Sequence, residues 1–382
     1  MTTYAPLPIT FTKGKGVYLW DKSGIQYLDA VAGVAVCGLG HAHPVIADAI
    51  AEQARTLVHT SNLYHIKHQE ELSDKLCGLS GMDRVFFSNS GAEANEAAIK
   101  LARLYGKQQG IERPNIIVAS GSFHGRTLAT LSATGNRKVQ AGFSPLVDGF
   151  VRVNYNDVEA IKTVAKTNTN VVAILVEPVQ GEGGVIVPNA DYLQQLRQIC
   201  DENNWMLMLD EIQTGIGRTG KWFAFQHTTI KPDVMTLAKA LGNGVPIGAC
   251  LASGKATTLF TPGTHGSTFG GNPLATRAAL TVLETIEKEN VIDNVNTLAD
   301  YFMAEFKAKL AGVKHVKEIR GSGLMIGIEL EKDCAELVVA ASEKGVLINV
   351  TAGNTIRLLP PLIINKEQAD TVIHIVTDLI KQ

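Results

Sequence analysis

Short apolar runs alternate with segments of helical period through the middle of the chain. Strands are predicted where these runs occur, at residues 85–88, 115–119, 150–153, 171–177, 206–210 and 247–252. Between the first two runs, apolar side chains recur with the period of an amphipathic helix, at positions 94, 97, 98, 101 and 104. Because continuous apolar strands that alternate with helices are typical of sheets buried on both faces, we expect a largely parallel sheet.

The two ends of the chain show other patterns. Residues 17–20 and 25–28 are strand-like runs joined by Asp-Lys-Ser-Gly, which predicts a hairpin. After about residue 275, two long helical stretches and a final helix from about 366 accompany strands expected at 324–330, 346–349 and 356–359. We therefore expect an α/β chain that divides into an N-terminal segment packed with the small domain, a large domain, and a small α+β domain, at 1–45, 46–274 and 275–382.

The composition excludes several classes of protein. The chain has 382 residues, of which 45% are hydrophobic and 19% are charged, as in an ordinary globular protein of two domains. Its 35 basic and 37 acidic residues give a net charge of −2, which offers no positive surface to nucleic acid or to a membrane. The first residues lack the pattern of a signal peptide, and glycine, histidine and proline interrupt the apolar run 30–47. We expect a cytoplasmic protein without a membrane span.

The cysteines and histidines give no sign of a disulfide framework or a metal site. Five cysteines, an odd number, are scattered without C-x-x-C spacing, at positions 37, 77, 200, 250 and 334. We interpret two close histidine pairs, 41 with 43 and 65 with 68, as structural, because neither stands in a metal-binding pattern. Reduced thiols and no bound metal are therefore expected.

A glycine-rich stretch at 215–221, Gly-Ile-Gly-Arg-Thr-Gly-Lys, fits two nucleotide-binding signatures by its glycine spacing alone. A dinucleotide loop stands directly between a strand and a helix and is followed by an acid about 20 residues later. Here Glu-Ile-Gln-Thr separates the expected strand from the loop, and residues 237–239 contain no acid. A triphosphate loop needs serine or threonine after its lysine, where this chain has Trp222. We therefore interpret the stretch as a scaffold loop.

Three features nearby point to a different cofactor. Asp210 ends an apolar strand, at the edge where open α/β sheets bind ligands. Lys239 lies in Leu-Ala-Lys-Ala-Leu, and apolar surroundings lower the pKa of a lysine. The turn 88–92, Ser-Asn-Ser-Gly-Ala, precedes a helix whose free amides suit a phosphate. Each feature alone has an ordinary alternative, namely a salt-bridge acid, a surface lysine or a helix cap. Together they describe a pyridoxal phosphate site.

Five segments of the chain then resemble one family, the class III aminotransferases of pyridoxal phosphate fold type I. They are Ser-Gly-Ala-Glu-Ala at 90–94, Phe-His-Gly-Arg-Thr at 123–127, Glu-Pro-Val-Gln-Gly-Glu-Gly at 177–183, Leu-Asp-Glu-Ile-Gln-Thr-Gly at 209–215 and Leu-Ala-Lys at 237–239. The resemblance extends in order along nearly the whole chain. It implies a large domain with a mostly parallel, seven-stranded type of sheet, a smaller α+β domain, and a homodimer with shared active sites. It also implies that the glycine-rich stretch is the loop after the cofactor aspartate.

The same resemblance assigns residues to the cofactor, pyridoxal 5'-phosphate. Lys239 would form an imine with the cofactor and then carry the proton during transamination, while Asp210 would pair with the pyridine nitrogen. Gln213 would approach the phenolic oxygen, and Phe123 would stack on one face of the ring. The phosphate would be bound by the start of a helix and by the neighbouring subunit, through Ser90, Gly91, Ala92 and Thr268.

Within the family, three segments look most like the acetylornithine aminotransferases, at 61–64, 123–132 and 264–273. This implies transfer of the terminal amine of N2-acetyl-L-ornithine to 2-oxoglutarate, a reaction of arginine biosynthesis. Arg126 and Arg357 would bind the two carboxylates of 2-oxoglutarate as forks. Glu182 would neutralise Arg357 while the donor reacts, and Ser267 would also contact substrate. For each residue alone, a surface salt bridge is the alternative.

The identity of the amino donor stays open to alternatives. Ornithine δ-aminotransferases tend to carry a tyrosine near 33–38, where this chain has Gly-Val-Ala-Val-Cys-Gly, and a small apolar lining fits an acylated amine better. Ornithine, succinylornithine, succinyl-diaminopimelate and 4-aminobutyrate are the alternative donors. A nucleotide-binding module is disfavoured by the missing magnesium and ribose ligands. A binding protein without activity is disfavoured because Lys239 and Asp210 are both present.

Overall fold

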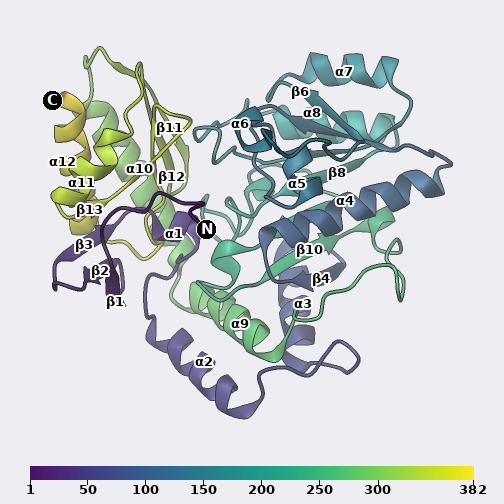
Figure 1. The fold of residues 1–382 in the computed structure, drawn as a ribbon, viewed down its shortest axis with the longest axis horizontal. Coiled ribbons are helices and arrows are strands. Elements are labelled where there is room, and N and C mark those ends of the chain that lie inside the picture. The colour runs from purple at the N-terminus through teal and green to yellow at the C-terminus, as the bar shows by residue number, and fades with distance from the viewer.

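The computed structural model describes residues 1–382, which form two lobes (Figure 1). The larger lobe is built on a seven-stranded sheet of order β4-β10-β9-β8-β7-β5-β6. In chain order its strands are β4 Arg84–Ser88, β5 Asn115–Ala119, β6 Phe150–Val153, β7 Val171–Val176, β8 Met206–Asp210, β9 Val234–Leu237 and β10 Gly248–Ala252. β10 runs antiparallel to its neighbours β4 and β9 and the other four pairs are parallel, so the mostly parallel sheet predicted from the sequence is confirmed.

Different helices cover the two faces of this sheet, because successive side chains of a strand point to opposite faces. On β8, Leu207 shares a buried cluster with Leu196 of α8, Tyr192–Glu202. The next residue, Met208, belongs to a second cluster that contains the apolar face of α4, Gly91–Gln108. The lobe therefore has three layers, with α4 and α8 on opposite sides of the sheet (Figure 1).

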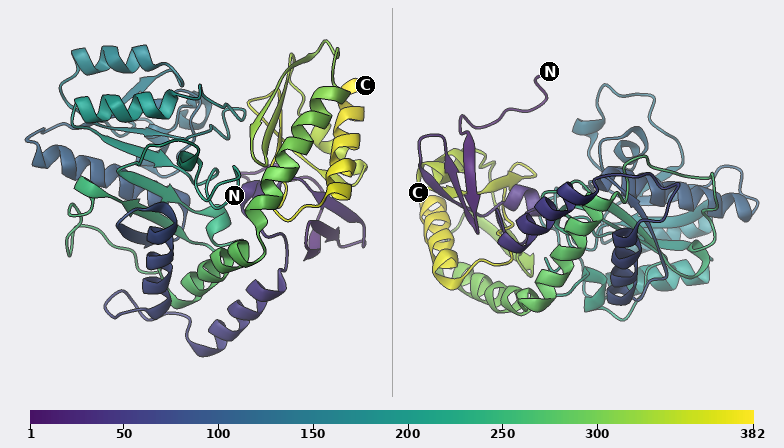
Figure 2. Two further views of the ribbon diagram at one scale, coloured as in Figure 1. Left: turned by 180° about the vertical axis from the view of Figure 1, so that it is seen from behind. Right: turned by 90° about the horizontal axis from the view of Figure 1, so that it is seen from below.

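The remaining helices of this part of the chain are shorter or lie at its edge. They are α1 Ala32–Ala35, α2 Pro44–Thr56, α3 Lys67–Ser80, α5 Leu128–Ala133, α6 Arg137–Gln140, α7 Val158–Thr167 and the 3-10 helices η1 Ala224–His227, η2 Lys239–Leu241 and η3 Gly254–Ala256. The helix α9, Pro273–Lys288, packs against α2 and α3 and leads the chain from the large lobe towards the small one (Figure 2). Every helix is too short or too polar to cross a lipid bilayer.

The small lobe combines a second sheet with a layer of helices. The sheet has the order β11-β12-β15-β14, with strands β11 Val316–Ser322, β12 Met325–Leu330, β14 Asn349–Thr351 and β15 Thr355–Leu358. Its helices are α10 Val291–Lys309, α11 Glu336–Glu343 and α12 Lys366–Lys381. The helices α10 and α12 lie side by side against the strands (Figure 2).

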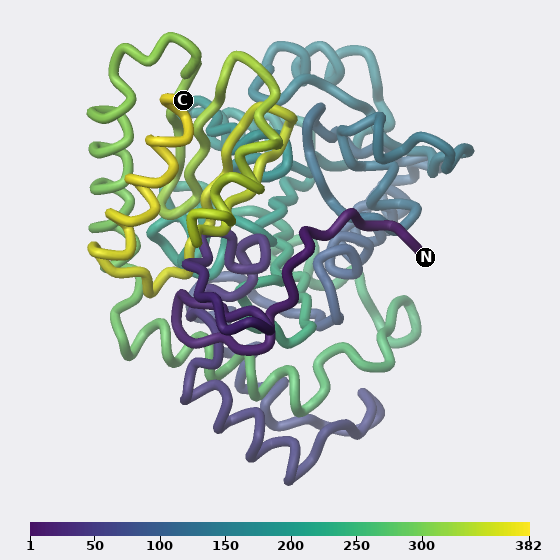
Figure 3. The backbone as a smooth tube through the Cα atoms, turned by 60° about the vertical axis from the view of Figure 1, so that its left-hand side comes forward, coloured from purple at the N-terminus to yellow at the C-terminus, as the bar shows by residue number.

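The N-terminal segment joins the small lobe through main-chain pairing. The strands β1 Phe11–Lys15, β2 Tyr18–Asp21, β3 Gln26–Asp29 and β13 Val346–Leu347 form a sheet in that order. The predicted hairpin is present as β2 and β3, and β3 pairs in parallel with β13, which places Leu28 opposite Val346. Figure 3 shows the purple N-terminal segment beside the yellow-green C-terminal strands. The domain boundaries at 45 and 274 stay a prediction.

The glycine-rich loop after β8 contacts the small lobe. Residues 215–220 lie in turns, and the next regular element is the short helix η1, so no α-helix begins at the loop. The guanidinium of Arg218 is fully buried, and its Nη1 donates to the carbonyl oxygens of Leu324 at 3.0 Å and Pro360 at 2.6 Å. Burial lowers the pKa of Arg218 to about 9. The loop thus connects the two lobes, as expected of a scaffold loop.

Candidate active site

A cavity of about 380 Å³ lies where β7, β8 and β9 end. Glu177, Asp210 and Lys239, which each follow or end one of these strands, all line it. The cavity also brings together most of the residues that the sequence predicted for the site, namely Ser90, Gly91, Ala92, Phe123, Arg126, Glu182, Asp210, Gln213 and Lys239. Segments far apart in the chain therefore meet at the carboxyl edge of the sheet, where α/β proteins bind ligands.

Lys239 begins the 3-10 helix η2 and retains some surface towards the cavity. Its φ of 46° lies in the left-handed region, which side chains other than glycine adopt at a cost. Burial lowers the pKa of Lys239 to about 8, with Glu182 opposing this effect and Arg357 adding to it. A large fraction of the amine is therefore neutral near pH 8, the form that can attack a carbonyl carbon.

Asp210 is held by a buried hydrogen-bond network. Its Oδ2 accepts from Nδ2 of Asn95 at 2.7 Å and from Nδ1 of His124 at 2.7 Å, and its Oδ1 accepts from the amide of Ile212 at 3.1 Å. Asn95 is fixed in turn, because Oγ1 of Thr236 donates to its Oδ1 at 2.8 Å. The carboxylate consequently has one orientation, and a positively charged ring nitrogen in the cavity would find it in place.

The start of α4 supplies a site for an anion. Ser90 is the N-cap, and its Oγ accepts from the amide of Glu93 at 3.2 Å. The first amides of a helix have no partner within the helix, and Gly91 and Ala92, which contribute them here, line the cavity. A Cβ at Gly91 would come within 2.7 Å of Cδ1 of Ile212, so a larger residue here would force the Ile212 side chain to move. Free amides and the helix dipole suit a phosphate group.

Glu182 lines the cavity and pairs with Arg357, which is buried behind it. Nη1 of Arg357 donates to Oε1 of Glu182 at 2.8 Å, although 175 residues separate them in the chain. The Arg357 side chain is only 2% exposed, whereas the Glu182 side chain is 38% exposed. The same Nη1 also approaches Oε1 of Gln213, at 3.4 Å. A buried guanidinium is thus covered by a carboxylate that has room to move.

Glu177 and Phe123 form another part of the wall. The Glu177 carboxylate accepts from the amides of Phe123 at 3.2 Å and Gly181 at 3.3 Å. Burial raises the pKa of Glu177 to about 7, although His124 nearby lowers it. The guanidinium carbon of Arg126 lies 5.6 Å from the centre of the Phe123 ring, which keeps the exposed Arg126 beside the cavity.

Three of the predicted residues do not line the cavity: Arg357, which is buried behind Glu182, and two residues of the loop 264–273. Thr268 is exposed, and Ser267 is half-buried, with its Oγ accepting from Nδ2 of Asn89 at 3.2 Å. Asn89 itself lines the cavity. Thr268 therefore makes no contribution within one chain, and its predicted contact with a neighbouring subunit stays a prediction.

Sequence reasoning missed several residues that shape the site. Asn95 and His124 hold Asp210, and Asn349 accepts two hydrogen bonds from Arg357. His124 lies inside the segment 123–127, which resembles the family, so this segment could have identified His124 as a site residue. Neither Asn95 nor Asn349 stands in a pattern that distinguishes it from other asparagines.

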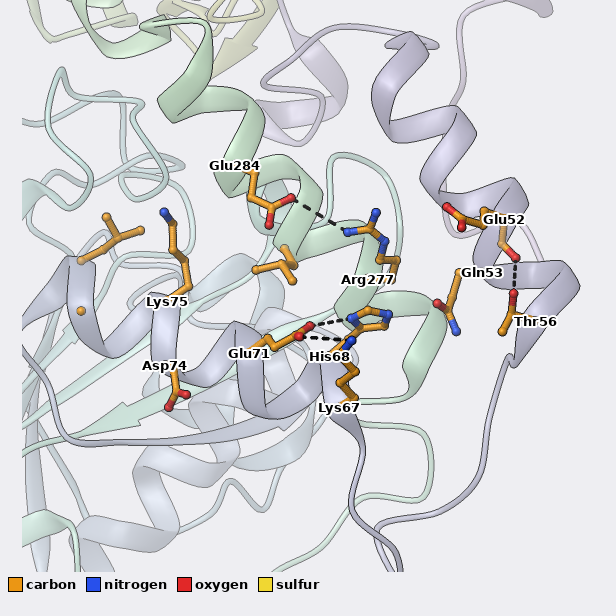
Figure 4. A pocket seen from close by; sticks show the side chains of 13 residues that line it. Glu52, Gln53, Thr56, Lys67, His68, Glu71, Asp74, Lys75, Arg277 and Glu284 are labelled. Atoms are coloured by element: carbon orange, nitrogen blue, oxygen red, sulfur yellow. Dashed lines mark hydrogen bonds and ion pairs between the residues drawn. The ribbon is translucent and has the colours of Figure 1, made fainter.

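A larger hollow of about 970 Å³ lies between α2, α3 and α9 (Figure 4). Its walls are mostly charged, and several of these charges form ion pairs. Nδ1 of His68 lies 2.8 Å from Oε2 of Glu71, and Nη1 of Arg277 lies 3.9 Å from Oε2 of Glu284. This hollow contains neither a buried lysine nor an acid at the end of a strand, so the smaller cavity is the better candidate for the active site.

Comparison with known proteins gives a consistent result. Residues 2–380 match the family described as aminotransferase class-III. An acetylornithine aminotransferase of Nitrosomonas europaea is 61% identical over 380 residues, covering 100% of this chain and 97% of that protein. An acetylornithine aminotransferase of Aquifex aeolicus is 48% identical over 381 residues, covering 100% of this chain and 99% of that protein.

Solved structures of similar fold include an ornithine aminotransferase and an acetylornithine aminotransferase. The ornithine aminotransferase of Toxoplasma gondii has a TM-score of 0.96 at 35% identity, covering 100% of this chain and 92% of that one. The acetylornithine aminotransferase of Elizabethkingia anophelis has a TM-score of 0.89 at 36% identity, covering 100% of this chain and 95% of that one.

Proposed function

Because the chain belongs to the class III aminotransferases, we propose that it transfers the terminal amine of N2-acetyl-L-ornithine to 2-oxoglutarate. The products are N-acetyl-L-glutamate 5-semialdehyde and L-glutamate, and the reaction is one of arginine biosynthesis. Relatives named acetylornithine aminotransferase, with 48% to 61% identity over essentially the whole chain, carry this proposal. Ornithine is the second candidate donor, since structural neighbours at 35% identity are ornithine aminotransferases.

The enzyme uses pyridoxal 5'-phosphate, and the cavity fits this cofactor. Lys239 would hold its aldehyde carbon, Asp210 its ring nitrogen, and the amides at the start of α4 its phosphate. When bound, the cofactor withdraws electrons from the carbon that bears the amino group, so that this carbon can lose a proton. Lys239 is suited to take up and return that proton, because burial brings its pKa to about 8.

The two arginines explain how one cavity accepts two different substrates. N-acetylornithine presents its terminal amine and has a single carboxylate, which Arg126 would bind at the exposed side of the cavity. 2-Oxoglutarate has two carboxylates, and the second would bind Arg357 after the Glu182 side chain moves away. While the donor reacts, Glu182 stays paired with Arg357, because a buried guanidinium without a partner would be energetically costly.

The apolar lining near Val36 favours an acylated donor. Val36 lines the cavity, from the segment in which ornithine δ-aminotransferases tend to carry a tyrosine. A valine offers no partner to the free α-ammonium group of ornithine, whose desolvation is unfavourable. The acetyl group of N-acetylornithine removes that charge, so this lining supports N-acetylornithine over ornithine.

We also propose a cytoplasmic homodimer with shared active sites. The loop residues Leu63, Tyr64 and Phe269 are 84%, 69% and 62% exposed, which leaves a large apolar surface beside the site. Nδ2 of Asn62 donates to the carbonyls of Ser267 and Gly270 and holds the two loops together. A second copy of the chain would cover this surface and would bring its Thr268 to the phosphate site.

The proposal is tested by assaying the purified protein, loaded with cofactor, with 2-oxoglutarate and a panel of amines. The panel contains N-acetylornithine, ornithine, succinylornithine, succinyl-diaminopimelate and 4-aminobutyrate, and the glutamate formed is measured. N-acetylornithine should give the highest kcat/KM. If another donor gives a higher kcat/KM, that donor replaces N-acetylornithine as the proposed substrate. If none of the donors yields glutamate, the proposal is overturned.

A further inference from the structure

Arg357 has a second, uncharged partner on the neighbouring strand. Asn349 on β14 stands directly opposite Arg357 on β15 in the antiparallel register. Its Oδ1 accepts from Nε of Arg357 at 3.1 Å and from Nη2 at 2.6 Å. Because a guanidinium can only donate, the amide oxygen must be the atom that faces it. The register of the hairpin therefore sets the position of this oxygen.

This contact decides which edge of the guanidinium is available to a ligand. A guanidinium carries five N–H donors, and Asn349 occupies the edge formed by Nε and Nη2. Nη1 instead donates to Glu182 at 2.8 Å, on the side of the cavity. When Glu182 leaves, the end of the guanidinium formed by Nη1 and Nη2 is the remaining edge for a carboxylate.

The neutrality of Asn349 matters as much as its position. An amide oxygen orients the two donors without cancelling the positive charge, so Arg357 keeps its attraction for a second carboxylate. A carboxylate in the same place would be a permanent counter-ion of Arg357. A substrate carboxylate would then gain much less binding energy from the guanidinium. The removable charge is then carried by Glu182 alone.

The backbone that carries Glu182 is fixed by the same sheet. Oγ1 of Thr351, also on β14, donates to the carbonyl oxygen of Glu182 at 2.6 Å. Arg320 on β11 donates to the carbonyls of Gly184 at 2.7 Å and Val185 at 2.9 Å. The movement of Glu182 is therefore confined to its side chain, while Asn349 holds Arg357 in place.

We propose that Asn349 is a specificity-determining residue, which orients Arg357 without neutralising its charge, so that the cavity can accept a dicarboxylate as well as a monocarboxylate. The inference rests on the proposed function, because it concerns the acceptor half of that reaction. Asn349 acts through Arg357 and touches no reacting atom. Its substitution should therefore slow the half-reaction of glutamate and leave that of N-acetylornithine nearly unchanged.

The decisive substitution is Asn349→Asp, which preserves shape and adds a charge. In the cofactor-loaded enzyme, kcat/KM for glutamate should fall by roughly 10- to 100-fold, because Arg357 acquires a permanent partner. The half-reaction of N-acetylornithine should change by less than about 3-fold, since its single carboxylate binds elsewhere. Each half-reaction is followed by the absorbance of the bound cofactor in single turnovers.

Ligand binding gives a readout that does not depend on turnover. Calorimetry with glutarate, an unreactive dicarboxylate, should show the same loss of affinity in Asn349→Asp. N-acetylnorvaline, which lacks the reactive amine and has one carboxylate, should bind with nearly unchanged affinity. Asn349→Ser, which removes the amide oxygen without adding charge, should weaken the binding of glutarate by a smaller factor, about 10-fold or less.

Asn365→Asp is the matched control, because it adds the same charge in the same lobe. Asn365 caps α12 by accepting from the amide of Gln368 at 2.9 Å, and aspartate caps equally well. This variant should leave both ligands unaffected. If Asn349→Asp and Asn349→Ser weaken the binding of glutarate and of N-acetylnorvaline equally, or weaken the binding of neither, the role proposed for Asn349 is wrong. A wild-type enzyme that neither binds glutarate nor reacts with glutamate would instead overturn the proposed function, and this inference with it.

Discussion

Oδ2 of Asp210 and Nδ1 of His124 lie 2.7 Å apart, and both side chains are buried. Asn95 donates to the same oxygen at 2.7 Å, so this oxygen already accepts two side-chain hydrogen bonds. Oδ1 accepts only the amide of Ile212 and retains more capacity for another donor. The orientation of the carboxylate thus depends on the two side chains, Asn95 and His124, that donate to Oδ2.

Replacing His124 should weaken the binding of pyridoxal phosphate. A hydrogen bond to a charged group contributes about 1.5–3 kcal/mol, so His124→Ala should raise the Kd of the cofactor by roughly 10- to 100-fold. Titration of the cofactor-free protein, followed by absorbance, measures this Kd. His124→Asn, which retains an amide donor near the Nδ1 position, should recover part of the loss. Equal losses in both variants would assign the effect to the volume of the ring.

Lys239→Ala should abolish covalent attachment of the cofactor. The variant should lose the visible absorbance band of the attached cofactor, and kcat should fall by roughly 10²–10⁴-fold or more, since the residue that moves the proton is gone. Some cofactor should remain bound through Asp210 and the start of α4. Dialysis and absorbance spectra measure both properties. Turnover close to that of the wild type would contradict the assignment of Lys239.

The choice of donor should follow the charge at the α-amino group. N-acetylornithine should exceed ornithine in kcat/KM by about 100-fold or more, because a charged amine without a partner costs several kcal/mol to desolvate. Val36→Tyr, which adds a hydroxyl group to the lining, should move the ratio towards ornithine. Steady-state kinetics with both donors measure the ratio, and similar values for the wild type would favour the ornithine alternative.

Glu182→Ala should change the balance between the two half-reactions. Arg357 would remain uncovered throughout the cycle, so glutamate should react better and N-acetylornithine worse. The ratio of their kcat/KM values should move towards glutamate by roughly 10-fold. Single half-reactions, monitored through the cofactor spectrum, separate this effect from product release. A uniform decrease in both half-reactions would mean that Glu182 has only a structural role.

A stability measurement tests the pair of half-buried His41 and buried Asp29, whose Nε2 and Oδ2 lie 2.8 Å apart. Hydrogen bonds to Asp29 and then to Cys37 raise the pKa of His41 to about 9 from an ordinary value of 6.5. The pair therefore stabilises the fold fully below pH 6.5, and its contribution disappears as the pH rises through about 9.

The Tm of the wild type should consequently fall more steeply between pH 6.5 and 9 than that of Asp29→Asn. The asparagine oxygen can still accept from the amides of Val31 and Ala32, as Oδ1 of Asp29 does, so the local turn is retained. Thermal denaturation across this range, at a saturating cofactor concentration, measures the difference. Parallel curves would show that the charge on His41 makes no contribution.

Most of the large sheet could be predicted from apolar runs, but its strand β9 was missed, as were β1 and β11 in the two smaller sheets. β9, Val234–Leu237, has only four residues and runs directly into Lys239, so its apolar character was interpreted as the setting of the lysine. β11, Val316–Ser322, lies at the edge of the small sheet and carries Lys317, Glu318 and Arg320. Edge strands of this kind lack a continuous apolar run.

The partners within the site depend on folding and have little local signal. Glu182 and Arg357 meet across 175 positions, and only resemblance to a family suggested that they would. Asn349 reaches Arg357 through the register of a hairpin, which the sequence does not display. Asp210 and Lys239 were more accessible to prediction, because the end of an apolar strand and an apolar run around a lysine are local features.

The left-handed backbone at Lys239 has a consequence for engineering. A side chain in this region costs on the order of 1 kcal/mol, and burial of the amine adds a further penalty. A glycine at this position would remove both the backbone cost and the cost of burying the amine. Any method that ranks substitutions by fold stability alone would therefore select against the lysine. Thermostabilised variants of the enzyme should therefore be designed with this position held constant, because here the most stable chain and the working catalyst are different molecules.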